Sequence, residues 1–425
     1  MTPSPEVAPA ISNPSPPEFS NEFLASTAAD SELSRSGLPG ITGWEATIAS
    51  PSPPDVRSPE QALQRLFSSD PIQASWFVPN FLQQIPLAQI QGVLTKIATR
   101  LGDLQSVRAT ETGYAIRFAK GTVPAQIRLT ADGQIMGLFF EPPLIPIPVE
   151  EAIAILETSP YTTGVLVTKD GNDIAAINPD MPVAVASAFK LAVLVALKQQ
   201  IDNGTLSWDT VVELRPEWKS LRSGILQDWP DGSQVTIDTL ATLMMFISDN
   251  TAADALIQII GRDSIAALAQ RNRPFLTTKE VFTLKDTANT ALLKRYQEGN
   301  ALARQQVLVE LGDRPVPDEN RLANAPINLE AEWWFTPREL CRLIETVADL
   351  PAMQINPGVA NRNAWKQIAF KGGSEPGVFN LTTWLQNQQG QTYCVAASWN
   401  STQQPLNEDG LTEVYQGLII GLEAE

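Results

Sequence analysis

The pattern of hydrophobic and polar residues divides the chain into three stretches. Residues 1–56 are rich in proline and serine and show no regular apolar repeat, which predicts a disordered linker. Residues 57–148 show two helical patterns and then strand-like alternation, whereas residues 149–425 show strands near both ends with helices between them. The pattern therefore predicts a linker followed by two α+β domains.

The first predicted domain, residues 57–148, begins with helices. Ser58 and Pro59 open a helix with an apolar stripe, and a second stripe covers residues 86–101. Alternating apolar residues then indicate three strands, at 114–118, 125–129 and 135–140. We expect one curved sheet wrapped around a helix.

The second predicted domain, residues 149–425, builds one sheet from both of its ends. Strand patterns occur at 162–169, 173–177, 365–370, 377–384 and 392–399. Helical spacing of apolar residues occurs at 188–201, 237–247, 251–260, 337–348 and 411–422. The last of these helices would cover one face of the sheet.

The composition restricts the possible chemistry. The chain contains no histidine, which excludes Ser-His-Asp and Cys-His mechanisms and removes the commonest zinc ligand. We therefore expect no metal or other cofactor. The 30 Lys and Arg against 47 Asp and Glu give a net charge of −17, which argues against nucleic acid as a partner. No apolar run approaches the roughly 20 residues of a membrane span.

Two cysteines, Cys341 and Cys394, lie in apolar, periodic segments. They are too few for a thiolate metal site or a disulfide framework. The pattern favours inert thiols in the core, with one disulfide as the alternative. The redox compartment therefore stays open.

Ser187 and Lys190 are candidates for nucleophilic catalysis. Without histidine, a serine nucleophile needs a nearby lysine that is neutral at working pH. The two residues are three positions apart at the start of the predicted helix 188–201, so their side chains share one face. The free amides of a helix N-terminus would also stabilise negative charge on the serine oxygen. The same spacing also fits a helix cap followed by a surface lysine.

A second motif, Ser248-Asp249-Asn250, falls on the predicted loop between two apolar helices. Asp249 is expected to cap the second helix, because a carboxylate accepts hydrogen bonds from free amides there. Ser248 and Asn250 are the polar groups that could face a cleft.

A third motif, Lys371-Gly372-Gly373-Ser374, follows the predicted strand that ends at Phe370. Two glycines allow another backbone or an extended substrate to approach closely. A plain β-turn would also use Gly-Gly, so this motif alone is ambiguous.

In this order the three motifs resemble the Ser-x-x-Lys, Ser-Asp-Asn and Lys-Thr-Gly set of class A β-lactamases and penicillin-binding proteins. The resemblance covers roughly residues 149–425. It implies a β-lactamase/transpeptidase-like α+β fold, in which helices and a helical subdomain flank an antiparallel sheet. It also implies that Ser187 is the acylated nucleophile, that Lys190 is its base and that Ser248 relays a proton.

The resemblance implies further roles in substrate binding. Lys371 would attract a substrate carboxylate or tune Ser248, and Asn250 would bind Lys190 or a substrate amide. The backbone amides of Ser187 and Ser374, beside Gly373, would form an oxyanion hole. Four aromatic residues could also line the site as a wall, or they could simply pack in the core. They are Trp229, Phe370 and, after a long connection over residues 287–332, Trp333 and Trp334.

Two departures from the family pattern bear on the reaction. Gly372 stands where the family usually carries a hydroxyl that helps to hold a substrate carboxylate, unless Ser374 replaces it. No Glu-x-x-x-Asn pattern follows the second motif, so the glutamate that assists deacylation in class A enzymes is missing. Glu280 lies in that region but is expected to be a solvated acid in the first turn of a helix. Deacylation should therefore be slow.

The first domain resembles the steroid-isomerase-like (cystatin-like) domain of two-domain serine hydrolases of the clavulanic acid pathway type. The resemblance rests on Gly-Leu-Phe-Phe at 137–140 before a proline-rich joint, and on Ile-Ser-Asp-Asn-Thr-Ala-Ala-Asp at 247–254.

Together, these features predict a serine hydrolase that acts on esters or β-lactam-type amides. The alternatives are a D-alanyl-D-alanine carboxypeptidase and a penicillin- or muropeptide-binding sensor that does not turn over. The expected partner is a small molecule, such as an ester, a β-lactam or a peptidoglycan-derived peptide, and the oligomeric state is open. The leader would act as a tether, which favours a periplasmic or extracytoplasmic location.

Overall fold

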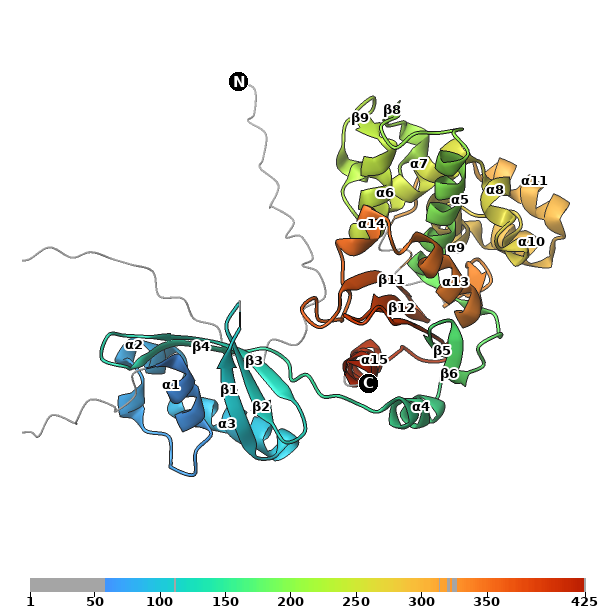
Figure 1. The fold of residues 1–425 in the computed structure, drawn as a ribbon. Helices are drawn as coiled ribbons and strands as arrows, with labels where there is room; N and C mark the ends of the chain where they lie inside the picture. Colours follow the sequence, from blue (N-terminus) through green and yellow to red (C-terminus); the bar gives the residue numbers. More distant parts are fainter. Residues whose placement is uncertain (1–57, 111, 313, 319–321, 323–326, 424–425) are drawn as a thin grey trace, which may run out of the picture. The chain divides into compact units, whose positions relative to one another are not determined.

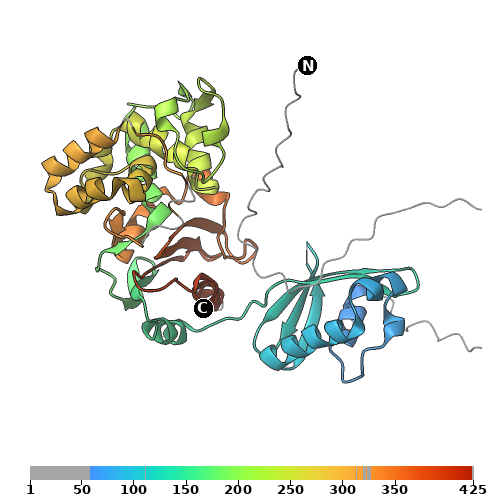
Figure 2. The ribbon, with the colours of Figure 1, turned by 180° about the vertical axis from the view of Figure 1, so that it is seen from behind.

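The computed structural model describes residues 58–425 except 111, 313, 319–321, 323–326 and 424–425. The chain divides into two compact units at Ile145 and Pro146 (Figures 1 and 2). The predicted linker, residues 1–56, lies outside the described residues.

The first unit is a four-stranded antiparallel sheet with helices packed on it. Its elements are α1 (Pro59–Leu66), α2 (Pro79–Gln84), α3 (Leu87–Leu101), β1 (Leu104–Ala109), β2 (Tyr114–Phe118), β3 (Thr122–Leu129) and β4 (Ile135–Phe140). The strands pair in the order β1-β2-β3-β4. The apolar stripes of α1 and α3 share one core with the sheet.

Local rules explain the elements that the sequence predicts here, and the ones it misses. Ser58 caps α1 by accepting a hydrogen bond from the amide of Gln61. The sequence pattern does not predict strand β1, because Val107 is the only buried residue of the six in this strand. A strand with so few apolar positions gives no alternation to recognise.

The second unit contains a five-stranded antiparallel sheet of order β11-β12-β13-β5-β6. Its strands are β5 (Thr162–Lys169), β6 (Asn172–Ile177), β11 (Gln367–Glu375), β12 (Val378–Gln386) and β13 (Thr392–Asn400). The pairing of β5 with β13 closes the sheet between the two ends of the unit, as predicted.

Strand β11 is longer than the sequence predicts. The Lys-Gly-Gly-Ser motif lies on the strand rather than in a turn after Phe370, and β11 pairs with β12 without interruption as far as Glu375. The Gly-Gly pair suggests a turn because glycine is unfavourable in strands. Here the ladder with β12 overrides that local preference.

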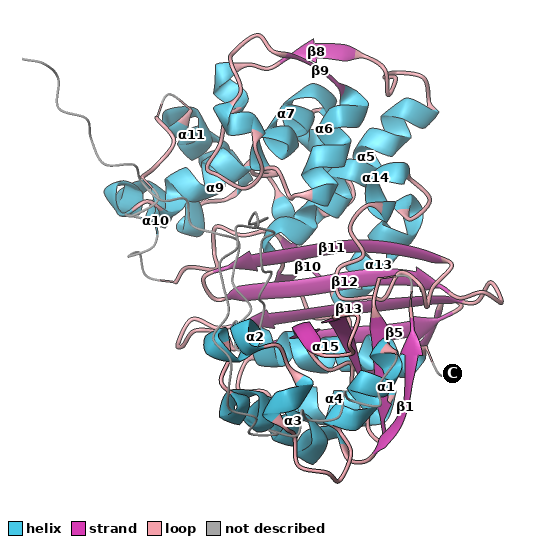
Figure 3. Cartoon of the chain, turned by 90° about the vertical axis from the view of Figure 1, so that its left-hand side faces the viewer, coloured by secondary structure: helices cyan, strands magenta, loops and turns pink. Residues whose placement is uncertain are grey.

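Helices cover both faces of this sheet, and each face has its own apolar core. Helices α15 (Glu408–Leu422) and α4 (Val149–Glu157) pack together on one face. On the other face lie α13 (Pro337–Val347), α5 (Lys190–Asp202), α6 (Ile237–Phe246), α7 (Asn250–Ile260) and α14 (Pro351–Gln354). Figure 3 shows α6, α7 and α14 on one side of β11–β13 and α15 on the other.

The long connection before Trp333 contributes helices to this second face. It includes α10 (Thr290–Glu298) and α11 (Ala301–Leu311), which pack on each other and on α9 (Thr278–Lys285). No helix in the described part of the chain combines the length and the hydropathy needed to cross a membrane.

The two cysteines form a disulfide, which corrects the expectation of inert core thiols. Cys341 on α13 is bonded to Cys394 on β13, with their Cα atoms 5.8 Å apart. Both residues are buried in the same core. Their apolar surroundings look the same for a buried thiol and for a buried disulfide, so the sequence did not distinguish them.

We predict that the Cys341→Ala/Cys394→Ala variant melts at a lower temperature than the wild type. The bond closes a loop with a sequence separation of 53 residues. Because the bond lowers the entropy of the unfolded chain, it should stabilise the folded protein by about 4 kcal/mol. This corresponds to a difference in Tm on the order of 10 °C. Differential scanning calorimetry measures the change. Reductant should lower the Tm of the wild type but not of the variant, and equal values for the two proteins would contradict the prediction.

Candidate active site

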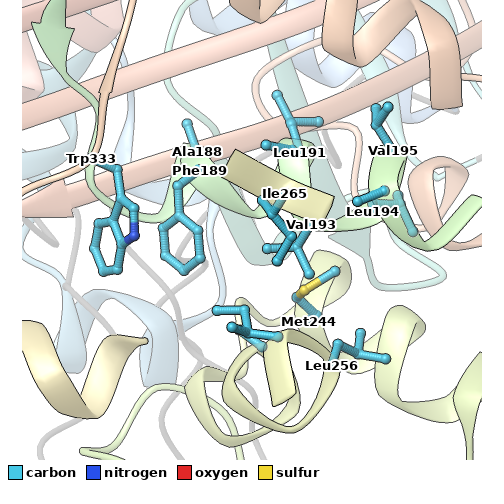
Figure 4. Close-up of a cluster of buried hydrophobic side chains, with 14 of the residues drawn as sticks. Ala188, Phe189, Leu191, Val193, Leu194, Val195, Met244, Leu256, Ile265 and Trp333 are labelled. Carbon is cyan, nitrogen blue, oxygen red and sulfur yellow. The ribbon is translucent and has the colours of Figure 1, made fainter. Parts of the chain in front are cut away.

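Ser187 lies on a short 3-10 turn, η2 (Ala186–Phe189), between strand β7 (Val183–Ala184) and α5. It lies inside this turn instead of capping α5, because the turn continues directly into the helix. Phe189 stacks on Trp333, with ring centroids 3.8 Å apart (Figure 4). The Trp333 carbonyl accepts a hydrogen bond of 3.0 Å from the Val185 amide. The core thus anchors the turn on both sides of a half-buried serine.

Lys190 is fully buried and lies among four oxygen atoms. Its Nζ is 2.6 Å from the Ser248 carbonyl oxygen and 2.8 Å from Oδ1 of Asn250. It is also 3.0 Å from Ser248 Oγ and 3.3 Å from Ser187 Oγ. Nδ2 of Asn250 donates to the Leu221 carbonyl, which fixes the orientation of the amide so that Oδ1 faces the lysine.

This geometry determines what the Lys190 amine can do with its protons. The carbonyl and amide oxygens only accept, so they occupy two N–H groups of the amine. The remaining tetrahedral position of Nζ faces the two serine hydroxyls. A charged amine donates a third hydrogen bond there, whereas a neutral amine presents a lone pair that can take a hydroxyl proton.

Burial lowers the pKa of Lys190 to about 7, although the negative charges of Asp249, Asp254 and Glu375 oppose the shift. A substantial fraction of the amine is therefore neutral near pH 7. A lysine needs a pKa lowered in this way if it is to accept a proton near neutral pH.

Lys371 lies on the other side of Ser248. Its Nζ is 3.1 Å from Ser248 Oγ and 2.5 Å from the Gly372 carbonyl oxygen, and the side chain is buried. Burial, followed by the charge of Lys190, holds the pKa of Lys371 well below its usual range. Ser248 Oγ therefore bridges two amines that disfavour each other's charge.

A buried carboxylate holds the Ser-Asp-Asn loop in place. Asp249 caps α7 as predicted, accepting from the Ala252 amide at 2.8 Å. Its other oxygen accepts from the amides of Ile225 and Leu226 at 2.7 and 2.9 Å. This second role, which the sequence did not indicate, ties a distant loop to the motif. Gly224 makes the approach possible, because its φ is +93° and a Cβ atom there would overlap the Asp249 carboxylate.

Strand β11 brings its backbone against the Ser187 turn. An ideal Cβ at Gly373 would lie 2.6 Å from the Ser187 amide nitrogen, so only glycine fits there. Residues 371 and 373 face Ser187, whereas their neighbours face α15, because side chains alternate along a strand. Ser374 Oγ accordingly donates to Glu408 on α15 at 2.8 Å.

The structure does not bring the two predicted aromatic residues to these side chains. Phe370 precedes Lys371 on β11 and therefore points to the opposite face, where it packs with the core under α15. Trp229 packs against the helical core and accepts a hydrogen bond from Lys219 through its carbonyl. Trp333 is itself a core residue.

Sequence reasoning missed a buried network behind Asn250. Asp254 on α7 accepts from the amides of Thr278 and Lys279 at 2.6 and 2.9 Å, and from Thr278 Oγ1 at 2.8 Å. Burial raises the pKa of Asp254 to about 7 despite these hydrogen bonds. The network joins the start of α9 to the helix that carries Asn250. The only sign of this network in the sequence is the aspartate one helical turn after the Ser-Asp-Asn motif.

Glu280 is a first-turn acid of α9, as expected, but it is not solvated. It forms a capping box with Thr277 and an ion pair with Arg262, and its side chain is 16% exposed. In the described part of the chain no cluster of three or more Cys, Asp or Glu is arranged to hold a metal ion.

Comparison with known proteins identifies the family of this chain. Residues 148–414 match the model of the Beta-lactamase enzyme family, and the chain belongs to this family. Over 103 residues it is 29% identical to β-lactamase VEB-1 of Pseudomonas aeruginosa, which covers 24% of this chain and 34% of that protein. The chain thus spans about a third of the length of this curated relative.

Solved structures that match this chain include a β-lactamase from Sphaerobacter thermophilus DSM 20745, at 21% identity and a TM-score of 0.44. The alignment covers 65% of this chain and 94% of that one. Another is PBP-A, at 18% identity and a TM-score of 0.43, over 65% of this chain and 97% of that one.

We predict that Gly224→Ala destabilises the protein more than Gly204→Ala does. Both glycines have positive φ, +93° and +77°, but a Cβ at Gly204 meets no atom within 4 Å. Gly204→Ala should cost about 1–2 kcal/mol from φ alone. Gly224→Ala should cost about 2 kcal/mol more, because the new methyl group overlaps the Asp249 carboxylate. Urea unfolding measures the free energy of unfolding of both variants. Equal losses would show that the loop around Gly224 does not depend on its close contact with Asp249.

Proposed function

We propose that this protein is a serine hydrolase that forms an acyl-enzyme at Ser187 and acts on esters or β-lactam-type amides. The observation that carries the proposal is the position of Lys190. Its buried amine lies 3.3 Å from the Ser187 hydroxyl, and burial lowers its pKa to about 7. A chain without histidine thus holds a base of suitable pKa beside a half-buried serine.

In the acylation step Ser187 Oγ attacks the substrate carbonyl carbon while neutral Lys190 takes the hydroxyl proton. The amides of Ser187 and Ser374 would donate to the developing oxyanion, an effect worth about 3 kcal/mol per donor in such reactions. The close approach of Gly373 to the Ser187 amide supports this arrangement, because the backbone of β11 then runs next to that of the Ser187 turn. Ser248, which bridges Lys190 and Lys371, would pass a proton to the leaving group.

Deacylation is expected to be slow. A water molecule that attacks the acyl-enzyme ester needs a base, and the carboxylates of Glu280 and Asp254 already have partners. Glu280 is engaged by Arg262 and by its own capping box, and Asp254 accepts three hydrogen bonds in a fully buried position. These contacts favour one alternative, a penicillin- or muropeptide-binding sensor that stays acylated.

The first unit and the location are also part of the proposal. We propose that residues 57–148 form a steroid-isomerase-like domain and residues 149–425 the hydrolase domain. A four-stranded sheet packed on α1 and α3 supports the first assignment. The disulfide supports a periplasmic or extracytoplasmic location, because such bonds form in oxidising compartments.

We predict that Ser187→Ala abolishes the covalent adduct and lowers turnover by a factor on the order of a thousand or more. A chromogenic ester and a chromogenic cephalosporin report turnover, and intact-mass spectrometry reports the adduct. Turnover lost with Ser187→Ala supports a hydrolase, whereas an adduct without turnover in the wild type supports the sensor.

The control for this experiment is Ser264→Ala, which removes an exposed serine on α8 (Arg262–Ala266). It should react like the wild type. Lys190→Met should retain the fold but lose acylation at neutral pH. Full activity of Ser187→Ala, or normal adduct formation by Lys190→Met, would remove these residues from the proposed roles.

We predict that the acylation rate rises with pH up to about 7 and is level above it. The reactive form of Lys190 is the neutral amine, whose fraction falls about tenfold for each pH unit below its pKa. The second-order rate constant for acylation, corrected for spontaneous hydrolysis, should follow this curve. A rate independent of pH between 5 and 9 would contradict a lysine base of this pKa.

A further inference from the structure

A cavity of about 270 Å³ lies in the second unit, close to the Ser187 turn but outside the site described above. Its walls come from the segment 271–276, from α10 and α11, and from residues 330–334. Trp333 belongs to these walls and stacks on Phe189, two residues after Ser187 (Figure 4). The proposed nucleophile and the lysines and serine around it do not line the cavity. It is therefore a separate space with its own lining chemistry.

The walls of the cavity fit one aromatic ring. Trp333, Trp334 and Tyr296 contribute aromatic side chains, and Pro274 and Leu276 contribute apolar atoms. A cavity of about 150 Å³ lined by apolar side chains is enough to bind benzene. The volume of about 270 Å³ therefore has room for one ring with a small polar substituent. Such a ring also packs favourably against aromatic walls.

Arg304, on α11, offers the cavity a cation without a counter-ion. Its guanidinium lies over the Tyr296 ring, 5.0 Å from the ring centroid, and its Nε donates to the Tyr296 carbonyl at 3.0 Å. Among the residues that the structure describes, no carboxylate pairs with Arg304 and no acceptor binds its two terminal nitrogens. The second arginine at the cavity, Arg271, is already paired with Glu339. Arg304 can therefore bind a carboxylate through its terminal N–H groups.

Glu332, a buried acid in the wall, does not oppose an anion. Burial, followed by the charge of Glu375, holds the pKa of Glu332 well above its usual range, although Lys285 opposes the shift. The neutral acid is therefore favoured near pH 7. Its Oε1 accepts from Lys285, which leaves the acidic proton on Oε2, a buried atom with no hydrogen-bond partner. A ligand oxygen in the cavity would satisfy this donor.

We propose that this cavity binds a small aromatic carboxylate, whose ring lies among the tryptophan and tyrosine side chains and whose carboxylate accepts hydrogen bonds from Arg304 and Glu332. The other acid at the cavity, Glu330, is exposed, so water weakens its repulsion of an anion. A neutral amide of the same shape would leave Arg304 without a counter-ion, and an ammonium would be repelled by it. The inference does not depend on the acylation of Ser187.

Calorimetric titration of the full-length protein at pH 7 tests the proposal with three probes. Benzoate, benzamide and benzylamine share one ring and differ in charge. We expect benzoate to bind at one site per chain with a dissociation constant below about 1 mM, and at least about tenfold more tightly than benzamide. Benzylamine should not compete with benzoate. Equal affinities for benzoate and benzamide, or no binding of benzoate at about 10 mM, would overturn the proposal.

The Arg304→Gln variant shows whether benzoate binds in this cavity. It should bind benzoate at least about tenfold more weakly, because it loses a charge-assisted hydrogen bond. The control is Arg342→Gln, which removes the same charge from an exposed residue of α13 that does not line the cavity. Its affinity should equal that of the wild type. Unchanged affinity in Arg304→Gln would show that benzoate binds elsewhere, for instance beside Lys190, and would overturn the proposal.

The Glu332→Gln variant tests the second donor. The glutamine carbonyl still accepts from Lys285 and its amide N–H group replaces the O–H donor, so the affinity for benzoate should stay within about threefold of the wild type. A gain of more than about tenfold would show that Glu332 is ionised in the wild type, which contradicts its proposed role.

If Arg304→Gln fails to fold, Arg304→Lys still decides. This variant keeps the positive charge but not the planar pair of donors, so it should weaken the binding of benzoate at least about threefold. Unchanged affinity would overturn the proposal.

Discussion

The exclusion of water from the Lys190 amine is the constraint on which the rest of the site depends. An ammonium in contact with water would keep its proton at neutral pH and could not act as a base. Helix α5 prevents that contact because it is buried over 191–197, where every residue belongs to the core (Figure 4). The hydrophobic packing of this helix therefore sets the proton affinity of a side chain at its first turn.

Polar contacts then determine where the buried amine points. Two oxygens that only accept, from Ser248 and Asn250, take two of its protons, so its third position must face the serine hydroxyls. Those oxygens are in turn held by Asp249, which the amides of a distant loop satisfy. The geometry around the Lys190 amine therefore depends on residues that do not contact it.

The sequence predicted the parts of the site that depend on local spacing, and missed those that depend on distant pairing. Ser187 and Lys190 are one helical turn apart, so their proximity follows from helix geometry alone. The loop amides that bind Asp249 and the Thr278 groups that bind Asp254 lie more than 20 residues away, and only the fold brings them together. Phe370 was predicted to line the site as part of an aromatic wall, but it directly precedes Lys371 on a strand that continues to Glu375. Once β11 continues, neighbouring residues must face opposite sides.

The exclusion of water that lowers the pKa of Lys190 also strengthens the other electrostatic interactions around its amine. Charges near a water-excluded centre interact over longer distances than charges in solvent. Lys371 lies on the other side of Ser248, and burial and the charge of Lys190 lower its pKa, so the charged state of one amine depends on that of the other. Around Lys285 the charges are balanced instead, because the lysine pairs with Glu375 while burial raises the pKa of Glu332 and disfavours a second negative charge.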